Sequence, residues 1–174
     1  RPANCRCGGQ VVAAVLNDQW FIDFNAKGWK EKSLECLNQM KVFPEAYKKQ
    51  FEDVFAWLDK RPCARRRGLG TLLPFSNEWT IESLSDSTIY MAFYTIIKSI
   101  REEKVKPEQL TESFFDFVFS GKGKVQEVEK HTKIQAASLE KIRGEFLYWY
   151  PNDHRHTAIA HITNHLSFLI FSHA

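Results

Sequence analysis

The spacing of apolar and polar residues along the chain predicts a mixed α/β protein. Residues 10–16 and 19–24 form two short apolar runs on either side of Asn17-Asp18, a pattern typical of two strands around a turn. Apolar positions three and four residues apart predict one helix over residues 27–40 and a second from Pro44 to about residue 58. The first third of the chain is therefore expected to be strands followed by helices, and neither helix shows a pattern that indicates chemistry.

Further along, a strand, a polar turn and a helix are expected in succession. Residues 79–84 read as the strand, and Ser85-Asp86-Ser87 supplies side chains that cap helix N-termini. The helix then runs to about Arg101. These polar side chains either only cap the helix, or Ser87 and Tyr90 face a pocket at the carboxyl end of the strand.

Two more helices are predicted, over residues 107–118 and about 136–148. The aromatic run at residues 146–150 indicates another strand, followed by a loop and a C-terminal helix. Two strands joined by a long helical crossover are usually parallel neighbours. The pattern therefore predicts part of a doubly wound sheet.

Composition narrows the class of protein. The 174 residues allow one ordinary domain or two small ones, and 44% hydrophobic with 26% charged residues is a globular balance. A net charge of +3 is too small to argue for nucleic acid by itself. No apolar run approaches the ~18 to 20 residues of a membrane span. The chain begins Arg-Pro without Met and ends in an apolar helix-like run, so a fragment of something larger is expected.

Two short motifs could bind a ligand. The knuckle Cys5-Arg-Cys7-Gly-Gly supplies two thiols, whereas a structural zinc site needs four ligands. Either these are two reduced cysteines in a turn, or they are half of a zinc site. The four cysteines do not resemble a disulfide framework, which favours a reducing compartment. Residues 59–74 form a loop with four arginines, which is either a phosphate contact or a solvated basic loop.

Five of the six histidines fall in the last 21 residues. His161 and His165 are four apart and would share a helix face. A metal site would need a third ligand such as His156 or Asp153, and no H-E-x-x-H motif is present. Alternatively, the imidazoles belong to the core or to caps, or they line a polar pocket that hydrogen-bonds a substrate. No nucleophile with its base is recognisable.

Several stretches resemble one family closely. They are Asp-Gln-Trp-Phe-Ile-Asp at 18–23, the segment 57–71, the segment 79–94 with Ser-Asp-Ser-Thr-Ile-Tyr-Met, and the segments 148–153 and 164–168. Together they resemble leucyl-tRNA synthetases of the archaeal and eukaryotic cytosolic type, over nearly the whole chain. The resemblance implies a class I synthetase with a Rossmann catalytic domain, which joins leucine to Mg-bound ATP and transfers it to tRNA(Leu).

The resemblance also implies roles for individual residues. Leu84, Ser87 and Tyr90 would line a leucine pocket, and His161 and His165 would close it. The segment before His161 would approach the ribose of ATP, but Ala158 and Ala160 stand where the family commonly has glycine and an acidic residue. An alanine methyl restricts close approach, and the ribose hydroxyls lose an acceptor. Cys5 and Cys7 would be the second half of a zinc site whose other cysteines lie upstream.

By the same resemblance, residues 1–78 would be a connective-peptide region and residues 79–174 the second half of the Rossmann domain. The chain contains neither H-x-G-H nor K-M-S-K-S, the two signatures on which the family relies to stabilise the transition state. We therefore expect a chain inactive by itself, from a monomeric cytoplasmic enzyme without membrane contact. The alternatives are a valine- or isoleucine-type synthetase, or a non-catalytic tRNA-binding module using the arginine loop.

Overall fold

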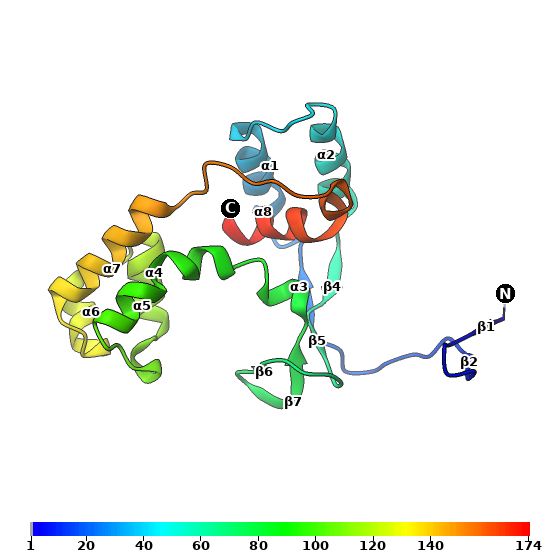
Figure 1. The fold of residues 1–174 in the computed structure, drawn as a ribbon, viewed down its shortest axis with the longest axis horizontal. Coiled ribbons are helices and arrows are strands. Elements are labelled where there is room, and N and C mark those ends of the chain that lie inside the picture. Colours follow the sequence, from blue (N-terminus) through cyan, green and yellow to red (C-terminus); the bar gives the residue numbers. More distant parts are fainter. Residues whose placement is uncertain (1) are drawn as a thin grey trace.

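The computed structural model describes residues 2–174 and combines helices with small sheets, which confirms the mixed α/β class (Figure 1). The helices are α1 (Trp29–Gln39), α2 (Tyr47–Trp57), α3 (Ser83–Asp86), α4 (Tyr90–Glu102), α5 (Glu112–Ser120), α6 (Val125–Thr132), α7 (Ala136–Trp149) and α8 (Ser167–His173). The strands are β1 (Ala3–Asn4), β2 (Gln10–Val11), β3 (Phe21–Asp23), β4 (Lys60–Pro62), β5 (Ala64–Arg65), β6 (Leu72–Leu73) and β7 (Ser76–Ile81). Short 3-10 turns lie at η1 (Pro107–Gln109) and η2 (Ile159–His161), and a π turn at η3 (Ile162–Leu166).

Every strand pair among residues 2–174 is antiparallel, so the predicted parallel pair is wrong for this chain. β1 pairs with β2, β3 with β4, and β7 lies between β5 and β6. The second strand expected at residues 146–150 is instead the end of α7. Leu139, Ile142 and Phe146 share the buried face of that helix, and this packing overrides the β-propensity of its aromatic residues.

The predicted hairpin over residues 10–24 is also wrong. Of the first apolar run, residues 10–16, only Gln10–Val11 is a strand, and it pairs back to β1. Val12, Val15 and Leu16 are exposed, and β3 pairs with the distant β4. The β1–β2 finger lies away from the rest of the molecule at the end of an extended segment (Figure 1).

Two hydrophobic cores organise the body of the molecule. The helical core is formed by α4 to α7, with Ile96, Phe114, Val118, Leu139 and Ile142 fully buried. The aromatic core joins α1, α2 and α8, and its buried residues are Phe24, Leu37, Phe51, Val54, Phe55, Leu58, Ile162, Ile170 and Phe171. Burying one such side chain stabilises the fold by about 1.5–3 kcal/mol.

Residues from distant parts of the chain meet in the aromatic core. The ring of Phe171 packs against the rings of Phe24, Trp29 and Phe55 at centroid distances of 5.1, 5.5 and 5.0 Å. The indole of Trp29 also donates to the Phe171 carbonyl at 2.6 Å. The C-terminal helix α8 is thereby held against α1 and α2, which fixes the position of the η3 turn that precedes it.

A hydrogen-bonded bridge links α7 to α8 and to the turn before α4. The Nε2–H of His173 donates to the Thr88 carbonyl at 2.7 Å, because a carbonyl can only accept. Its Nδ1 therefore accepts from the Tyr150 hydroxyl at 2.6 Å. Thr88 is buried, and its hydroxyl lies 3.2 Å from that of Ser172. The bridge thus connects the two cores at one point.

Candidate functional site

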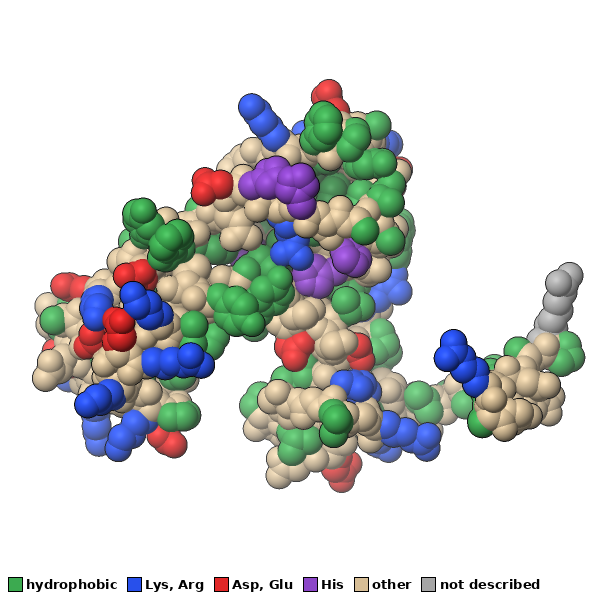
Figure 2. Space-filling view, viewed as in Figure 1, with side chains coloured by type: hydrophobic (Ala, Val, Ile, Leu, Met, Phe, Trp, Pro, Cys, Tyr) green, Lys and Arg blue, Asp and Glu red, His purple; other side chains and the backbone are tan. Residues whose placement is uncertain are grey.

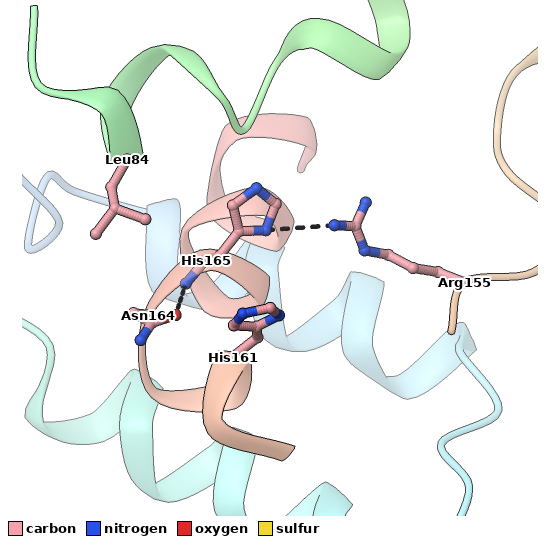
Figure 3. A pocket seen from close by; sticks show the side chains of 5 residues that line it. All are labelled: Leu84, Arg155, His161, Asn164 and His165. Carbon is pink, nitrogen blue, oxygen red and sulfur yellow. Dashed lines mark hydrogen bonds between the residues drawn. The ribbon is translucent and has the colours of Figure 1, made fainter. Parts of the chain in front are cut away.

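A small cavity lies where the α3–α4 turn meets the η2 and η3 turns (Figure 3). Its volume is about 320 Å³, and it is lined by Leu84, Arg155, His161, Asn164 and His165. β7 ends at Ile81, and the chain turns at once into α3, which places Leu84 beside the histidine turn. The site therefore combines a residue from the middle of the chain with four from its C-terminal part.

The two histidines lie side by side, with ring centroids 6.2 Å apart. His161 Nδ1 lies 2.5 Å from the Thr157 hydroxyl. His165 Nδ1 faces Arg155 Nη2 at 3.5 Å, so this nitrogen carries a lone pair. Burial, and then the charges of Arg155 and His161, lower the pKa of His165, while the backbone of Ser87 opposes the shift. The His165 imidazole is therefore neutral at neutral pH.

Three of the five residues predicted for a leucine pocket come together in this cavity. They are Leu84, His161 and His165. Ser87 is the C-cap of α3 and is not among the residues that line the cavity, although its backbone affects the pKa of His165. Tyr90 is 39% exposed and packs edge-on against Tyr94 at 5.3 Å, outside the cavity lining. The roles assigned to these residues stay predictions.

Arg155 and Asn164 line the cavity without having been predicted to do so. The only signal in the sequence was a basic residue inside the histidine cluster. Asn164 lies in the π turn, where its Nδ2 donates to the Ala160 carbonyl at 3.3 Å and its Oδ1 accepts from the His165 amide. It therefore holds the turn as well as facing the cavity.

Ala158 and Ala160 are both exposed on the segment that leads into the cavity. Two polar neighbours of this segment, Thr157 and Asn164, have partners within the chain. The Thr157 hydroxyl bonds to His161, and Asn164 bonds to Ala160. The methyl side chains of Ala158 and Ala160 themselves offer no acceptor for ribose hydroxyls.

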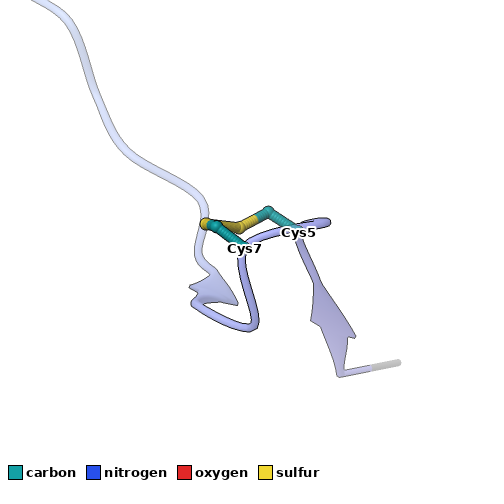
Figure 4. The surroundings of a disulfide bond; sticks show 2 residues. All are labelled: Cys5 and Cys7. Carbon is teal, nitrogen blue, oxygen red and sulfur yellow. A yellow bond between two sulfur atoms is a disulfide. The ribbon is translucent and has the colours of Figure 1, made fainter.

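No group of three or more His, Cys, Asp or Glu side chains that could hold a metal ion occurs in residues 2–174. Cys5 and Cys7 are joined by a disulfide in the β1–β2 finger, so the expectation of two reduced cysteines is wrong for this state (Figure 4). The amide of Cys5 donates to the Gly9 carbonyl at 2.8 Å, and Gly8 has φ +83°, which together reverse the chain and bring the sulfurs together. Disulfide sulfurs are not thiolate ligands.

Residues 59–74, predicted as one loop, include the short strands β4, β5 and β6, and three of their four arginines have partners inside the chain. Arg65 donates to the carbonyls of Arg67 and Leu69 at 3.2 and 2.8 Å and lies 3.5 Å from Glu82. The guanidinium of Arg61 lies 4.8 Å from the Trp57 ring, and that of Arg66 lies 4.5 Å from the Trp79 ring. These three side chains therefore make contacts within the chain, although Arg66 is also exposed to solvent.

Across the face shown in Figure 2, histidine side chains gather over the C-terminal segment, while Lys and Arg are spread widely. None of the helices within residues 2–174 has both the length and the apolar character needed to cross a membrane.

Comparison with known proteins identifies the relatives of this chain. No family model matches it. It is 55% identical over 174 residues to leucine–tRNA ligase of Staphylothermus marinus and 54% identical over 173 residues to that of Pyrobaculum calidifontis, covering 99% of this chain in both cases. It is 49% identical over 174 residues to leucine–tRNA ligase 2 of Saccharolobus solfataricus, covering 100% of this chain. In each comparison the chain spans 18% of the length of the relative.

At this level of identity, the chain is homologous over its whole length to a segment of aminoacyl-tRNA ligases. Within that class, its relatives are the archaeal leucine–tRNA ligases. The resemblance found in the sequence is confirmed, and a valine- or isoleucine-type relative is not favoured.

Proposed function

We propose that this chain is the leucine-binding segment of a leucine–tRNA ligase, which joins leucine to ATP as leucyl-adenylate and transfers it to tRNA(Leu). The observation that carries the proposal is the cavity in which Leu84 from α3 faces His161 and His165 from the C-terminal turns. The full-length similarity to leucine–tRNA ligases supports the choice of amino acid.

One side of the cavity suits a branched apolar side chain, while the other four lining residues are polar. Leu84 supplies an apolar wall, and a neutral His165 presents the edge of its ring without a buried charge. One methylene more or less in such a pocket changes affinity by about 1–3 kcal/mol. Shape, rather than a charged contact, would therefore discriminate leucine from smaller amino acids.

The larger architecture belongs to the same proposal. Residues 79–174 would form the second half of a class I Rossmann domain, and residues 1–78 a connective region. The homology of the whole chain to leucine–tRNA ligases supports this assignment, although β7, which leads into α3, lies in an antiparallel sheet within this chain. A monomeric, cytoplasmic enzyme is the setting that we propose.

The other ligands of such an enzyme would be held mostly by residues outside this cavity. Mg-bound ATP would need a ribose acceptor elsewhere, because Ala158 and Ala160 lack one. Zinc would need Cys5 and Cys7 in reduced form together with further ligands, since two thiols do not complete a tetrahedral site. A tRNA phosphate near the arginine loop would meet Arg67 first, because Arg61, Arg65 and Arg66 are engaged. A tRNA-binding module built on this loop is correspondingly less well supported.

Leucine binding to the chain tests the proposal. Leucine should shift the side-chain NMR signals of His161 and His165 at lower concentration than glycine does, while His131 on α6 stays unchanged. Leu84→Ala should weaken leucine binding about tenfold, because it removes one apolar wall. Leu147→Ala is the matched control, since Leu147 is an exposed leucine on α7.

Two results would contradict this assignment. One is a pair of histidine signals that do not respond to leucine. The other is equal affinity for leucine in the Leu84→Ala and Leu147→Ala variants. Leucine-dependent ATP–pyrophosphate exchange by the chain alone would show that its active site is complete, against our expectation.

A further inference from the structure

The cavity contains a guanidinium without an acidic partner. None of the ion pairs in the described part of the chain includes Arg155, and none of the five residues that line the cavity is acidic. A guanidinium carries five N–H donors and stays charged at every physiological pH. The cavity therefore has a net positive character that the chain itself does not neutralise.

The contacts that Arg155 does make are weak. Its Nη2 lies 3.5 Å from His165 Nδ1, at the outer limit of hydrogen bonding, and its Nη1 lies 3.8 Å from the Met91 sulfur. A thioether sulfur is a poor acceptor. In Figure 3 the guanidinium extends from its loop toward the ring of His165. Arg155 is exposed, and its guanidinium N–H groups are therefore accessible to a ligand.

Other arginines show what a purely structural role looks like in this molecule. Arg143 donates to the carbonyls of Phe117 and Val118 at 2.7 and 2.8 Å. Arg65 bonds to two loop carbonyls and lies beside Glu82. Both guanidinium groups meet oxygen acceptors of the chain, whereas the two contacts of Arg155 are a ring nitrogen and a sulfur.

We infer that Arg155, with His165 beside it, forms an oxyanion-binding subsite of this cavity. Its ligand is a carboxylate or phosphate group, since the planar guanidinium fork matches the paired oxygens of either. The inference rests on the proposed function for its choice of source: the carboxylate of leucine or the phosphate of an adenylate.

Inorganic phosphate is the first probe, added to the whole chain while histidine side-chain NMR signals are followed. Phosphate should shift the His165 signal, and Arg155→Gln should weaken the apparent affinity about tenfold, as expected for loss of charged hydrogen bonds. Arg155→Lys keeps the charge but lacks the paired N–H donors, so its phosphate affinity should lie between those of the parent chain and the Arg155→Gln variant. Arg101→Gln, at an exposed arginine on α4, should bind as the parent chain does. Equal phosphate affinity in the Arg155→Gln and parent chains would overturn the inference.

Leucine, leucinol, AMP and adenosine then distinguish the sources of the anion. If Arg155→Gln weakens leucine binding and leaves leucinol binding unchanged, the subsite takes the carboxylate. If it weakens AMP binding and leaves adenosine, leucine and leucinol unchanged, the subsite takes the phosphate. If no anion depends on Arg155 while leucinol still binds, the subsite fails and the leucine pocket stands. If phosphate binding depends on Arg155 while neither leucine nor leucinol binds, the subsite stands and the proposed function fails.

Discussion

The helical core and the aromatic core are stabilised by similar burial but are assembled in different ways. The buried residues of the helical core all come from residues 96–146, so its contacts are local in sequence. The aromatic core joins residues 24–58 with residues 162–171, and its Trp29–Phe171 hydrogen bond spans 142 positions. Ile162, from the same π turn as Asn164 and His165, is buried in the aromatic core. The candidate site therefore depends on the aromatic core, whose contacts join residues far apart in the sequence.

Truncating one large residue in each core should expose this difference. Phe171→Ala should lower the free energy of unfolding by about 3–5 kcal/mol and Ile142→Ala by about 2–5 kcal/mol, because each leaves a cavity among fully buried neighbours. Only Phe171→Ala should also abolish the shifts that leucine causes at His161 and His165. Urea unfolding and histidine NMR measure the two effects.

The exposed Phe75 provides the control, since Phe75→Ala should change the free energy of unfolding little. The comparison breaks down if Ile142→Ala removes the histidine response in a chain that is still folded. That outcome would mean that the helical core, and not the aromatic core, positions the site.

The bridge between the cores provides a smaller test. Tyr150→Phe removes the hydroxyl that donates to His173 and should lower the free energy of unfolding by about 1 kcal/mol. The double variant with Phe171→Ala should lose less unfolding free energy than the sum of the two single losses, because both changes loosen α8. Tyr148→Phe, at a tyrosine that is 77% exposed, serves as the control in the same urea titrations. Strict additivity would show that the bridge does not couple the cores.

The smallest expected effect is a dependence of stability on pH. The pKa of His165 lies below the ordinary value of about 6.5, chiefly because the ring is partly buried. The unfolded chain therefore takes up a proton at this residue before the folded chain does. The contribution of neutral His165 is complete above about pH 6.5 and is lost as the pH falls through the lowered pKa.

The free energy of unfolding, measured from pH 7.5 downward, should accordingly fall as the pH falls. His165→Gln should reduce this slope, and His131→Gln should leave it unchanged. His131 lies on an exposed face of α6. A slope that survives in His165→Gln would assign the effect to another group.

Much of the fold was predictable wherever burial follows the local pattern. The helices α1, α2, α4 and α5 were expected from apolar residues at helical spacing. The aromatic end of α7 was read as a strand because the burial of Phe146 against the helical core cannot be seen locally. In the same way, the pairing of β3 with β4 depends on a contact across nearly forty residues.

The residues of the candidate site were likewise predictable only where the sequence itself carries the signal. Leu84, His161 and His165 were identified through family resemblance, and the cavity does bring them together. Arg155 was missed, because its place in the cavity depends on how distant parts of the chain meet in space, and a sequence does not show that. Conversely, the loop arginines looked free in the sequence, although Arg65 and Arg66 have partners inside the chain.

The π turn at Ile162–Leu166 sets the angular phase of the last helix. At about 100° per residue, an unbroken α-helix would place Phe171 about 180° around the axis from Ile162. The π turn takes up one residue more than an α turn, which reduces that angle to about 80°. Ile162, Ile170 and Phe171 can then enter the same core while His161 and His165 stay at the cavity. Removing one residue from this turn would rotate either the imidazoles or the apolar face out of place, so the length of this turn is itself part of the site.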